Sequence, residues 1–218
     1  MPLASAEPIE WSVKEGDTYT WVVRQTNEGL GFLPVGSKYE MTIDTIRIWD
    51  SSGGEQQTEL YVNLTSYNSD TEVTTTILNN QTLVYFDAAT NTTTFFPIIN
   101  HTGFCIPKTN IDGCVEGIED FLDSVYDFEV TLHLQQGNEM GIGAGDTDTN
   151  LVYAWAFRIN NPVVYEFVVA YSSTPNNYEY RLLLKSGGSV SLGNFFIVFL
   201  GIGVISLIYL SKKKIKQN

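Results

Sequence analysis

The apolar run near the C-terminus constrains this chain most strongly. Residues 195–210 read FFIVFLGIGVISLIYL, with no charged residue and no proline. Extended back to Val190, the run has about 20 residues, and as a helix it spans the roughly 30 Å hydrocarbon core of a bilayer. In lipid, only a helix satisfies the backbone polar groups of a single segment. We therefore predict a transmembrane helix over residues 190–211. The alternative is a buried helix ending a soluble domain.

The residues after this run indicate its orientation. Tyr209 stands where an aromatic residue lies at a membrane interface, and a lysine cluster follows it. Lysine clusters beside a span remain on the cytoplasmic side. The cluster consists of Lys212, Lys213, Lys214 and Lys216. We expect a single-pass protein of the cell membrane, with residues 212–218 as a basic cytoplasmic tail and the N-terminal domain outside.

The charge distribution agrees with this orientation. Of the 12 Lys and Arg residues, four follow Leu210, so eight remain beside all 25 Asp and Glu residues, a formal charge of −17 before the lysine tail. Nucleic-acid binding depends on phosphate neutralisation by Lys and Arg. The sequence therefore predicts no nucleic-acid partner.

The N-terminal residues permit two interpretations. Residues 1–7 contain Ala4-Ser5-Ala6, which fits the small-x-small pattern of a signal-peptidase site, but no basic and apolar segment precedes it. We interpret residues 1–7 as the remnant of a signal peptide. The alternative is a disordered start on a tail-anchored protein.

Strict alternation of apolar and polar residues predicts strands in the second half of the chain. Alternating apolar positions run over residues 151–157, 163–171 and 178–184, with turn sequences between them. This pattern is typical of an antiparallel meander with one large apolar face. We expect an extracytoplasmic β-rich domain over residues 8–185 and a Ser/Gly linker over residues 186–189.

The first half shows the same pattern with two interruptions. A change of phase at Asp44-Thr45 predicts a β-bulge. Apolar residues at helical spacing over 115–125 predict a short amphipathic helix, capped by Asn110 or Asp112, and a following strand with Val130, Leu132 and Leu134 inward. The predicted fold is mainly β: an antiparallel sandwich, or a curved sheet packed with one short amphipathic helix, plus the C-terminal transmembrane helix.

Two cysteines occur, Cys105 and Cys114. Outside the cell they could form a disulfide worth about 2–3 kcal/mol, whereas the alternative is two unpaired thiols. We predict the disulfide. Two cysteines without a nearby pair of histidines do not favour a zinc site.

Asparagine sequons cluster in the middle of the chain. Residue 63 lies on the polar side of a predicted strand, so an outward-facing glycosylated patch is plausible. The candidate positions are Asn63, Asn80, Asn91 and Asn100.

The segment GDTDTN at 145–150 begins like a calcium loop, with oxygen ligands at Asp146, Asp148 and Asn150. An EF-hand then requires Gly at its sixth position and Glu at its twelfth, where this chain has Leu151 and Phe157. A polar turn that leads into a strand is the better interpretation. No catalytic or cofactor motif occurs in the sequence, so we predict neither an enzyme nor a cofactor.

Two segments, WSVKEGDTYTWVV over residues 11–23 and GSKYEMTI over 36–43, together with the apolar run and its KKKIK ending, resemble uncharacterised surface-anchored proteins of Asgard-group archaea. The resemblance covers about a quarter of the chain. It implies export and display on the cell surface with no assigned enzymatic role, and it carries over no functional residues.

The leading hypothesis from the sequence is a membrane-anchored cell-surface domain with a structural or interaction role, whose partners are envelope proteins or glycans. A lipid- or carbohydrate-binding module is the second, and an envelope hydrolase the third. A binding module requires an enclosed apolar pocket or an exposed aromatic row, and Trp11 and Trp49 are the residues whose faces decide this. A hydrolase requires two carboxylates that converge in a cleft.

Overall fold

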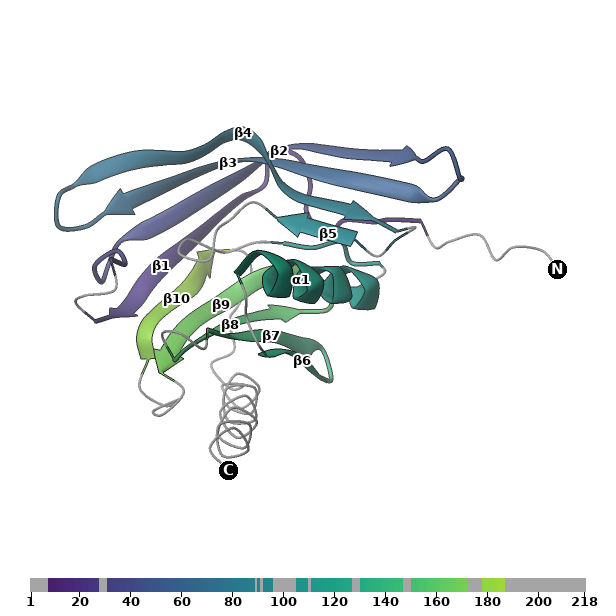
Figure 1. The fold of residues 1–218 in the computed structure, drawn as a ribbon. Coiled ribbons are helices and arrows are strands. Elements are labelled where there is room, and N and C mark those ends of the chain that lie inside the picture. Colours follow the sequence, from purple (N-terminus) through teal and green to yellow (C-terminus); the bar gives the residue numbers. More distant parts are fainter. Residues whose placement is uncertain are drawn as a thin grey trace, which may run out of the picture.

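The computed structural model describes residues 8–27, 31–88, 90, 92–95, 105–109, 111–126, 130–146, 150–171 and 178–186. These residues form a mainly β domain with one helix (Figure 1). The elements in chain order are β1 (Thr18–Thr26), β2 (Lys38–Asp50), β3 (Gln56–Asn68), β4 (Val73–Asp87), β5 (Thr92–Phe95), α1 (Ile111–Tyr126), β6 (Val130–Gln136), β7 (Glu139–Asp146), β8 (Leu151–Arg158), β9 (Asn161–Tyr171) and β10 (Tyr178–Ser186).

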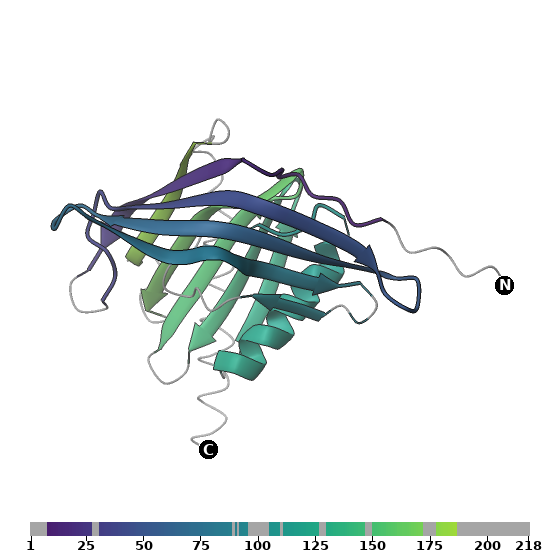
Figure 2. The same cartoon turned by 90° about the horizontal axis from the view of Figure 1, so that it is seen from above.

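All ten strands belong to one antiparallel sheet, in the order β5-β4-β3-β2-β1-β10-β9-β8-β7-β6. The chain builds the sheet as two meanders of five strands, and the first and last strands, β1 and β10, pair at its centre. The sheet curls so that β2–β4 and β7–β9 face each other across the interior (Figures 1 and 2). The mainly β class and the curved sheet are therefore confirmed.

Helix α1 lies at the open side of the curl, where the two edges of the sheet approach each other (Figure 1). It contacts β5, which forms one edge, and β6 and β7, which form the other. Its buried face includes Val115 and Ile118, while Glu116, Asp120 and Asp123 are exposed. The predicted amphipathic helix is confirmed, but it begins at Ile111, so Asp112 lies inside the first turn instead of capping it.

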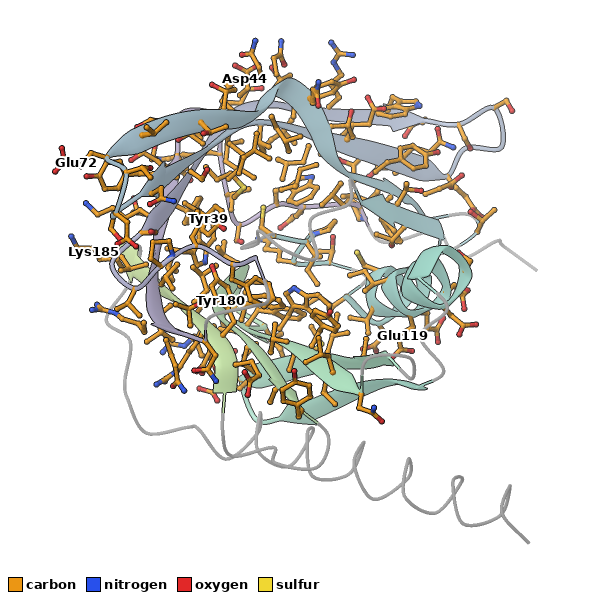
Figure 3. The ribbon with its side chains drawn as sticks, turned by 60° about the vertical axis from the view of Figure 1, so that its left-hand side comes forward. Tyr39, Asp44, Glu72, Glu119, Tyr180 and Lys185 are labelled. Carbon is orange, nitrogen blue, oxygen red and sulfur yellow. The ribbon has the colours of Figure 1, made fainter. Side chains whose placement is uncertain are left out.

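The space between the two halves is filled with large side chains. Trp21, Phe86, Phe157 and Phe167 are among the largest fully buried residues. Tyr180, labelled in Figure 3, stacks on Phe32 with 4.4 Å between ring centroids. The interior of the curl is a packed core.

The register confirms the predicted bulge in β2. Pairing with β3 shifts between Ile43 and Thr45, so that Ile43 and Ile46 both point into the core side of the sheet although they are three residues apart. A second shift occurs in β9, where Val164 pairs with Phe157 and Glu166 with Ala156. The residue between them, Tyr165, is the extra residue of that bulge, and it is partly buried against the core.

The register contradicts the prediction for the strand after α1. In β6, positions 130, 132 and 134 pair with Gly145, Gly143 and Gly141 of β7. Gly143 pairs in turn with Ala154 of β8, which lies on the outer face of the sheet, opposite Trp155. Alternation alone could not indicate which face of β6 is inward, because the glycine-rich β7 was not predicted as a strand.

The predicted transmembrane helix, the linker and the lysine tail lie outside the described residues, apart from Ser186 at the end of β10. Within the described ranges, α1 is the single helix, and it is too short and too polar to cross a membrane.

Candidate functional site

The structure places the two ambiguous tryptophans in different environments. Trp11 packs against the core, and its Nε1 donates a 2.9 Å hydrogen bond to Thr58 Oγ1. Trp49 pairs with Gln57 on the opposite face and is 36% exposed. Trp49 is therefore the more exposed of these two tryptophans.

Trp49 belongs to a group of side chains that we call the aromatic surface. This surface lies on the outer face of β2, β3 and β4, with the core on the other side of the sheet. Its members are Arg47, Trp49, Gln57, Glu59, Tyr61, Tyr85 and Asp87.

Two ring contacts organise the aromatic surface. The rings of Trp49 and Tyr85 lie 6.3 Å apart between centroids, tilted by 35°. The guanidinium carbon of Arg47 lies 4.7 Å from the ring centroid of Tyr61, a cation–π contact. Both contacts hold flat groups on the rigid sheet instead of on a loop.

Hydrogen bonds fix the polar members of the surface. Tyr61 OH donates to Glu59 Oε2 at 2.8 Å, and Gln57 Nε2 donates to Asp87 Oδ2 at 2.8 Å. Partial burial raises the pKa of Tyr85, and the negative charges of Asp87 and Glu59 raise it further. The phenol of Tyr85 therefore remains a neutral hydrogen-bond donor at physiological pH.

This combination suits recognition of a neutral, polyhydroxylated molecule. Exposed aromatic rings stack against the C–H faces of sugar rings, and carboxylates, amides and guanidinium groups form directional hydrogen bonds with hydroxyls. A planar polyanion would be repelled by Glu59 and Asp87. The surface is open and convex, so it fits the side of an extended chain better than a small enclosed ligand.

A second polar group lies beside the aromatic surface and contains two of the sequons. Asn63 shares the outer face of β3 with Tyr61; its Nδ2 donates to Asp44 Oδ1 at 3.3 Å, and its Oδ1 accepts from the Asn80 backbone N–H at 2.8 Å. Figure 3 shows Asp44 on the outside of the sheet. Asn80 is exposed and adopts a left-handed conformation with φ 46°.

The predicted outward position of Asn63 is confirmed, whereas its side-chain amide is already held by hydrogen bonds. Asn80 is exposed to solvent. Asn91 and Asn100 lie outside the described residues.

The two cysteines do not form the predicted disulfide. Cys105 and Cys114 are both buried free thiols. Cys105 pairs through its backbone with Val163 of β9, and Cys114 lies on the buried face of α1, where its Sγ accepts from Thr93 Oγ1 at 3.5 Å. Each thiol is packed as a small apolar group in the core, and burial raises the pKa of both.

The segment that resembles a calcium loop is the connection from β7 to β8. Asp146 ends β7 and pairs with Leu151, and Asn150 is exposed with φ 58°. Leu151 and Phe157 would occupy the sixth and twelfth positions of an EF-hand loop. Both are apolar and buried in β8, so they do not meet the requirements of those positions. Asp148 lies outside the described residues, and within the described ranges no cluster of metal-ligating side chains occurs.

The most deeply buried acidic group with a shifted pKa is Glu166 of β9. Arg181 Nε donates to its Oε1 at 2.8 Å. Burial raises the pKa of Glu166, and the charge and hydrogen bond of Arg181 partly oppose the rise. This carboxylate is paired with a cation rather than with a second carboxylate, so it does not provide the pair that a glycoside hydrolase requires.

Comparison with known proteins gives no family for this chain. No family model matches the sequence, and no curated protein is significantly similar to it.

Sequence reasoning identified Trp49 as a residue of interest but missed its partners. Glu59, Tyr61 and Tyr85 lie at outward positions of strands whose inward positions are apolar, and that alternation is the signal that could have found them. Which outward residues of different strands meet depends on the register, which the sequence does not state.

Proposed function

We propose that this chain is a membrane-anchored cell-surface domain that has an interaction role outside the cell. The apolar run at 190–211 and the lysines after it support an anchor with the domain outside. Strand β10 ends at Ser186, so the folded domain leads into the run after a few residues. The domain closes its own core, as expected for a unit that is displayed on a tether.

The observation that carries the interaction role is the aromatic surface itself. Trp49 is exposed beside Tyr85 on a rigid sheet, and hydrogen-bonded polar groups surround the two rings. An exposed tryptophan without a packing role costs solubility, and large exposed aromatic groups commonly mark binding sites. The surface lies on the outer face of β2–β4, which is turned away from β7–β9 (Figure 1).

A carbohydrate-binding module is the more specific candidate within this role. The aromatic and polar groups match a neutral glycan, and the convex shape suits a polysaccharide of a cell envelope. The lipid alternative requires an enclosed apolar cavity, whereas large side chains such as Trp21, Phe157 and Phe167 fill the space between the two halves.

A binding experiment with the full chain in lipid nanodiscs tests this function. We expect it to bind a subset of neutral oligosaccharides in an immobilised panel, and Trp49→Ala to weaken that binding by about tenfold, equivalent to about 1.4 kcal/mol. Ile48→Ala is the matched control, because Ile48 is the next residue, is 44% exposed and points to the other face.

Two results would contradict the carbohydrate proposal: the absence of binding to every neutral glycan in the panel, or equal binding by the native chain and Trp49→Ala. A loss of binding in both variants would indicate general damage to β2, and would also count against a specific role of Trp49.

A further inference from the structure

The outer face of the sheet carries a group of basic residues at its centre, where the first and last strands pair. Before the lysine tail, the chain has eight Lys and Arg residues beside 25 Asp and Glu residues. Three of the eight are exposed here, and we call them the basic surface: Arg24 of β1, Lys38 of β2 and Lys185 of β10. An otherwise acidic domain therefore collects exposed positive charge on three adjacent strands.

Strand register and alternation place the three side chains on the same face. Each is exposed and is next, within its own strand, to a residue of the core, so each points outward. The core neighbours are Val23, Tyr39 and Leu184. Lys38 pairs with Val22, and Val22 pairs in turn with Leu183, two residues before Lys185. Figure 3 shows Lys185 on the outside of the sheet.

The charges of the basic surface are not neutralised within the domain. In the part of the chain that the structure describes, no carboxylate forms an ion pair with these three residues, whereas the neighbouring Arg181 is paired with Glu166. The Nζ of Lys38 lies 5.9 Å from the ring centroid of Tyr67, a contact that leaves its charge in place. Glu40, exposed and opposite Thr20, is the acidic neighbour in the same rows. One carboxylate among three cations leaves the surface positive.

The position of Lys185 relates this surface to the proposed anchor. Lys185 is the last residue but one of β10, and Val190, where the predicted span begins, is five residues further along the chain. Five fully extended residues reach about 17 Å. A chain anchored by this span therefore holds Lys185 close to the lipid headgroups, and Arg24 and Lys38 lie on the next two strands.

We propose that the basic surface docks the tethered domain on anionic phosphate headgroups of the bilayer that holds its anchor. The inference rests on the proposed membrane anchor and adds the orientation of the domain. Trp49 is eleven residues further along β2 than Lys38, roughly 36 Å at 3.3 Å per residue. The docked domain would thus keep the aromatic surface free for a ligand.

The acidic character of the rest of the domain does not prevent this docking. Charges more than about 8 Å from the membrane surface are largely screened at physiological ionic strength. Each basic residue close to an anionic surface favours association about fivefold. The tether supplies a high effective concentration of lipid, so a contribution of this size is sufficient to populate the docked orientation.

Fluorescence quenching of the full chain in lipid nanodiscs tests the orientation. A bimane label on Thr18→Cys reports on the basic surface, because Thr18 is exposed on the outer face of β1 and the native thiols are buried. A label on Ser52→Cys, beyond the far end of β2, is the control. Headgroup-spin-labelled lipid quenches a label near the bilayer surface. We expect quenching at Thr18→Cys to be at least about threefold stronger with phosphatidylglycerol than with phosphatidylcholine alone, and unchanged at Ser52→Cys.

Charge substitutions identify the residues responsible. Arg24→Gln/Lys185→Gln should lower the ratio of docked to free domains about 25-fold and remove the increase in quenching. Arg47→Gln/Lys108→Gln removes the same charge from exposed positions outside the basic surface and should preserve the increase. Equal quenching in the two lipids would overturn the proposal. It would also be overturned by an increase that survives the first double substitution, or by one that the second also removes.

Flotation with phosphatidylcholine vesicles tests the anchor separately, because neutral lipid receives the apolar run but offers no net charge. A chain that floats but shows no lipid-dependent quenching keeps the anchor and overturns the docking. A chain that does not float contradicts the anchor, and the basic surface must then bring it to phosphatidylglycerol vesicles by itself. Absence of that binding, or its persistence in Arg24→Gln/Lys185→Gln, overturns the docking too.

A second copy of the chain is the other occupant that the measurements distinguish. A dimer in detergent that Arg24→Gln/Lys185→Gln dissociates, while Arg47→Gln/Lys108→Gln does not, would assign the basic surface to contact between copies and overturn the membrane docking. We expect the native chain and both double variants to have the same mass in detergent.

Discussion

Trp21 connects the two meanders of the sheet through a single polar atom. It belongs to β1 and is fully buried, and its Nε1 donates a 2.7 Å hydrogen bond to the carbonyl oxygen of Val164 in β9. The two residues are 143 positions apart in the chain. A buried carbonyl that loses its donor bears an uncompensated desolvation cost of about 1–3 kcal/mol.

We therefore expect Trp21→Phe to lower the free energy of unfolding by about 2–4 kcal/mol, from the lost hydrogen bond and the smaller ring. The same change at the exposed Trp49 should alter it by less than about 0.5 kcal/mol. Urea unfolding of the two variants beside the native chain makes the comparison. Equal stabilities of the two variants would show that the Trp21 hydrogen bond does not hold the meanders together.

The state of the two cysteines can be measured by thiol titration. Because both thiols are buried and free, we expect Ellman's reagent to detect none in the native chain at pH 8 and two after unfolding in guanidinium without a reductant. Detection of no thiol in the unfolded, unreduced chain would show that a disulfide had formed.

Burial also makes these thiols a source of pH dependence. It raises the pKa of Cys114 from 9.0 to about 12. Between these values the unfolded thiol loses its proton while the folded one keeps it, so the stabilisation is complete below pH 9 and is lost as the pH rises towards 12. Over that range Cys114→Ala should lose less unfolding free energy than the native chain. An equal or steeper loss would contradict the raised pKa.

At the scale of the element, α1 is the part that closes the open side of the sheet. Ile118 lies on its buried face. Because α1 contacts both edges of the sheet, a substitution that weakens the packing of the helix should also destabilise β5 and β6.

We expect Ile118→Ala to lower the free energy of unfolding by about 2–4 kcal/mol through the cavity it leaves. Ile48→Ala, at an exposed position, should lower it by less than about 1 kcal/mol. In Ile118→Ala, the rate of amide hydrogen exchange should increase more at β5 and β6 than at the strands in the centre of the sheet. If Ile118→Ala lowered the free energy of unfolding no more than Ile48→Ala, the packing of α1 would not contribute to the stability of the sheet.

Most elements followed from the sequence because their apolar residues alternate in one phase. The change of phase between Ile43 and Ile46 also predicted the bulge of β2 correctly, since both residues belong to the core. Strand β7 was not predicted because glycine occupies its outward positions, and glycine gives no alternation of apolar and polar side chains. Without β7, the face of β6 was assigned wrongly.

The candidate site was harder to predict than the fold. The alternation places Tyr61 and Tyr85 outward, but it does not show that Tyr85 lies beside Trp49 from a different strand. The prediction of a disulfide was wrong for a related reason. Spacing along the chain says that two cysteines could meet, whereas the fold uses each as a small buried group on a different element, α1 and the segment beside β9.

At the scale of the whole molecule, the two outer faces of the curled sheet have different chemistry. The outer face of β2–β4 carries the aromatic surface. The outer face of β8 and β9 carries small apolar residues such as Ala154 and Ala170 beside the Glu166–Arg181 ion pair, with the core between the two halves (Figure 1). The described chain ends in β10, and strands β1 and β2 lie between β10 and β3 in the sheet, so the aromatic surface is separated from the point where the proposed anchor would begin.

The most direct test of this account is the fate of the chain when it is exported behind a signal peptide in a bacterial host, with one epitope at Gly187 and another after Asn218. We predict that the chain remains in the membrane fraction. Proteinase added to cells with a permeabilised outer layer should remove the Gly187 epitope and leave the C-terminal one protected. Release of the intact chain into the exported soluble fraction, with both epitopes accessible, would contradict the membrane anchor.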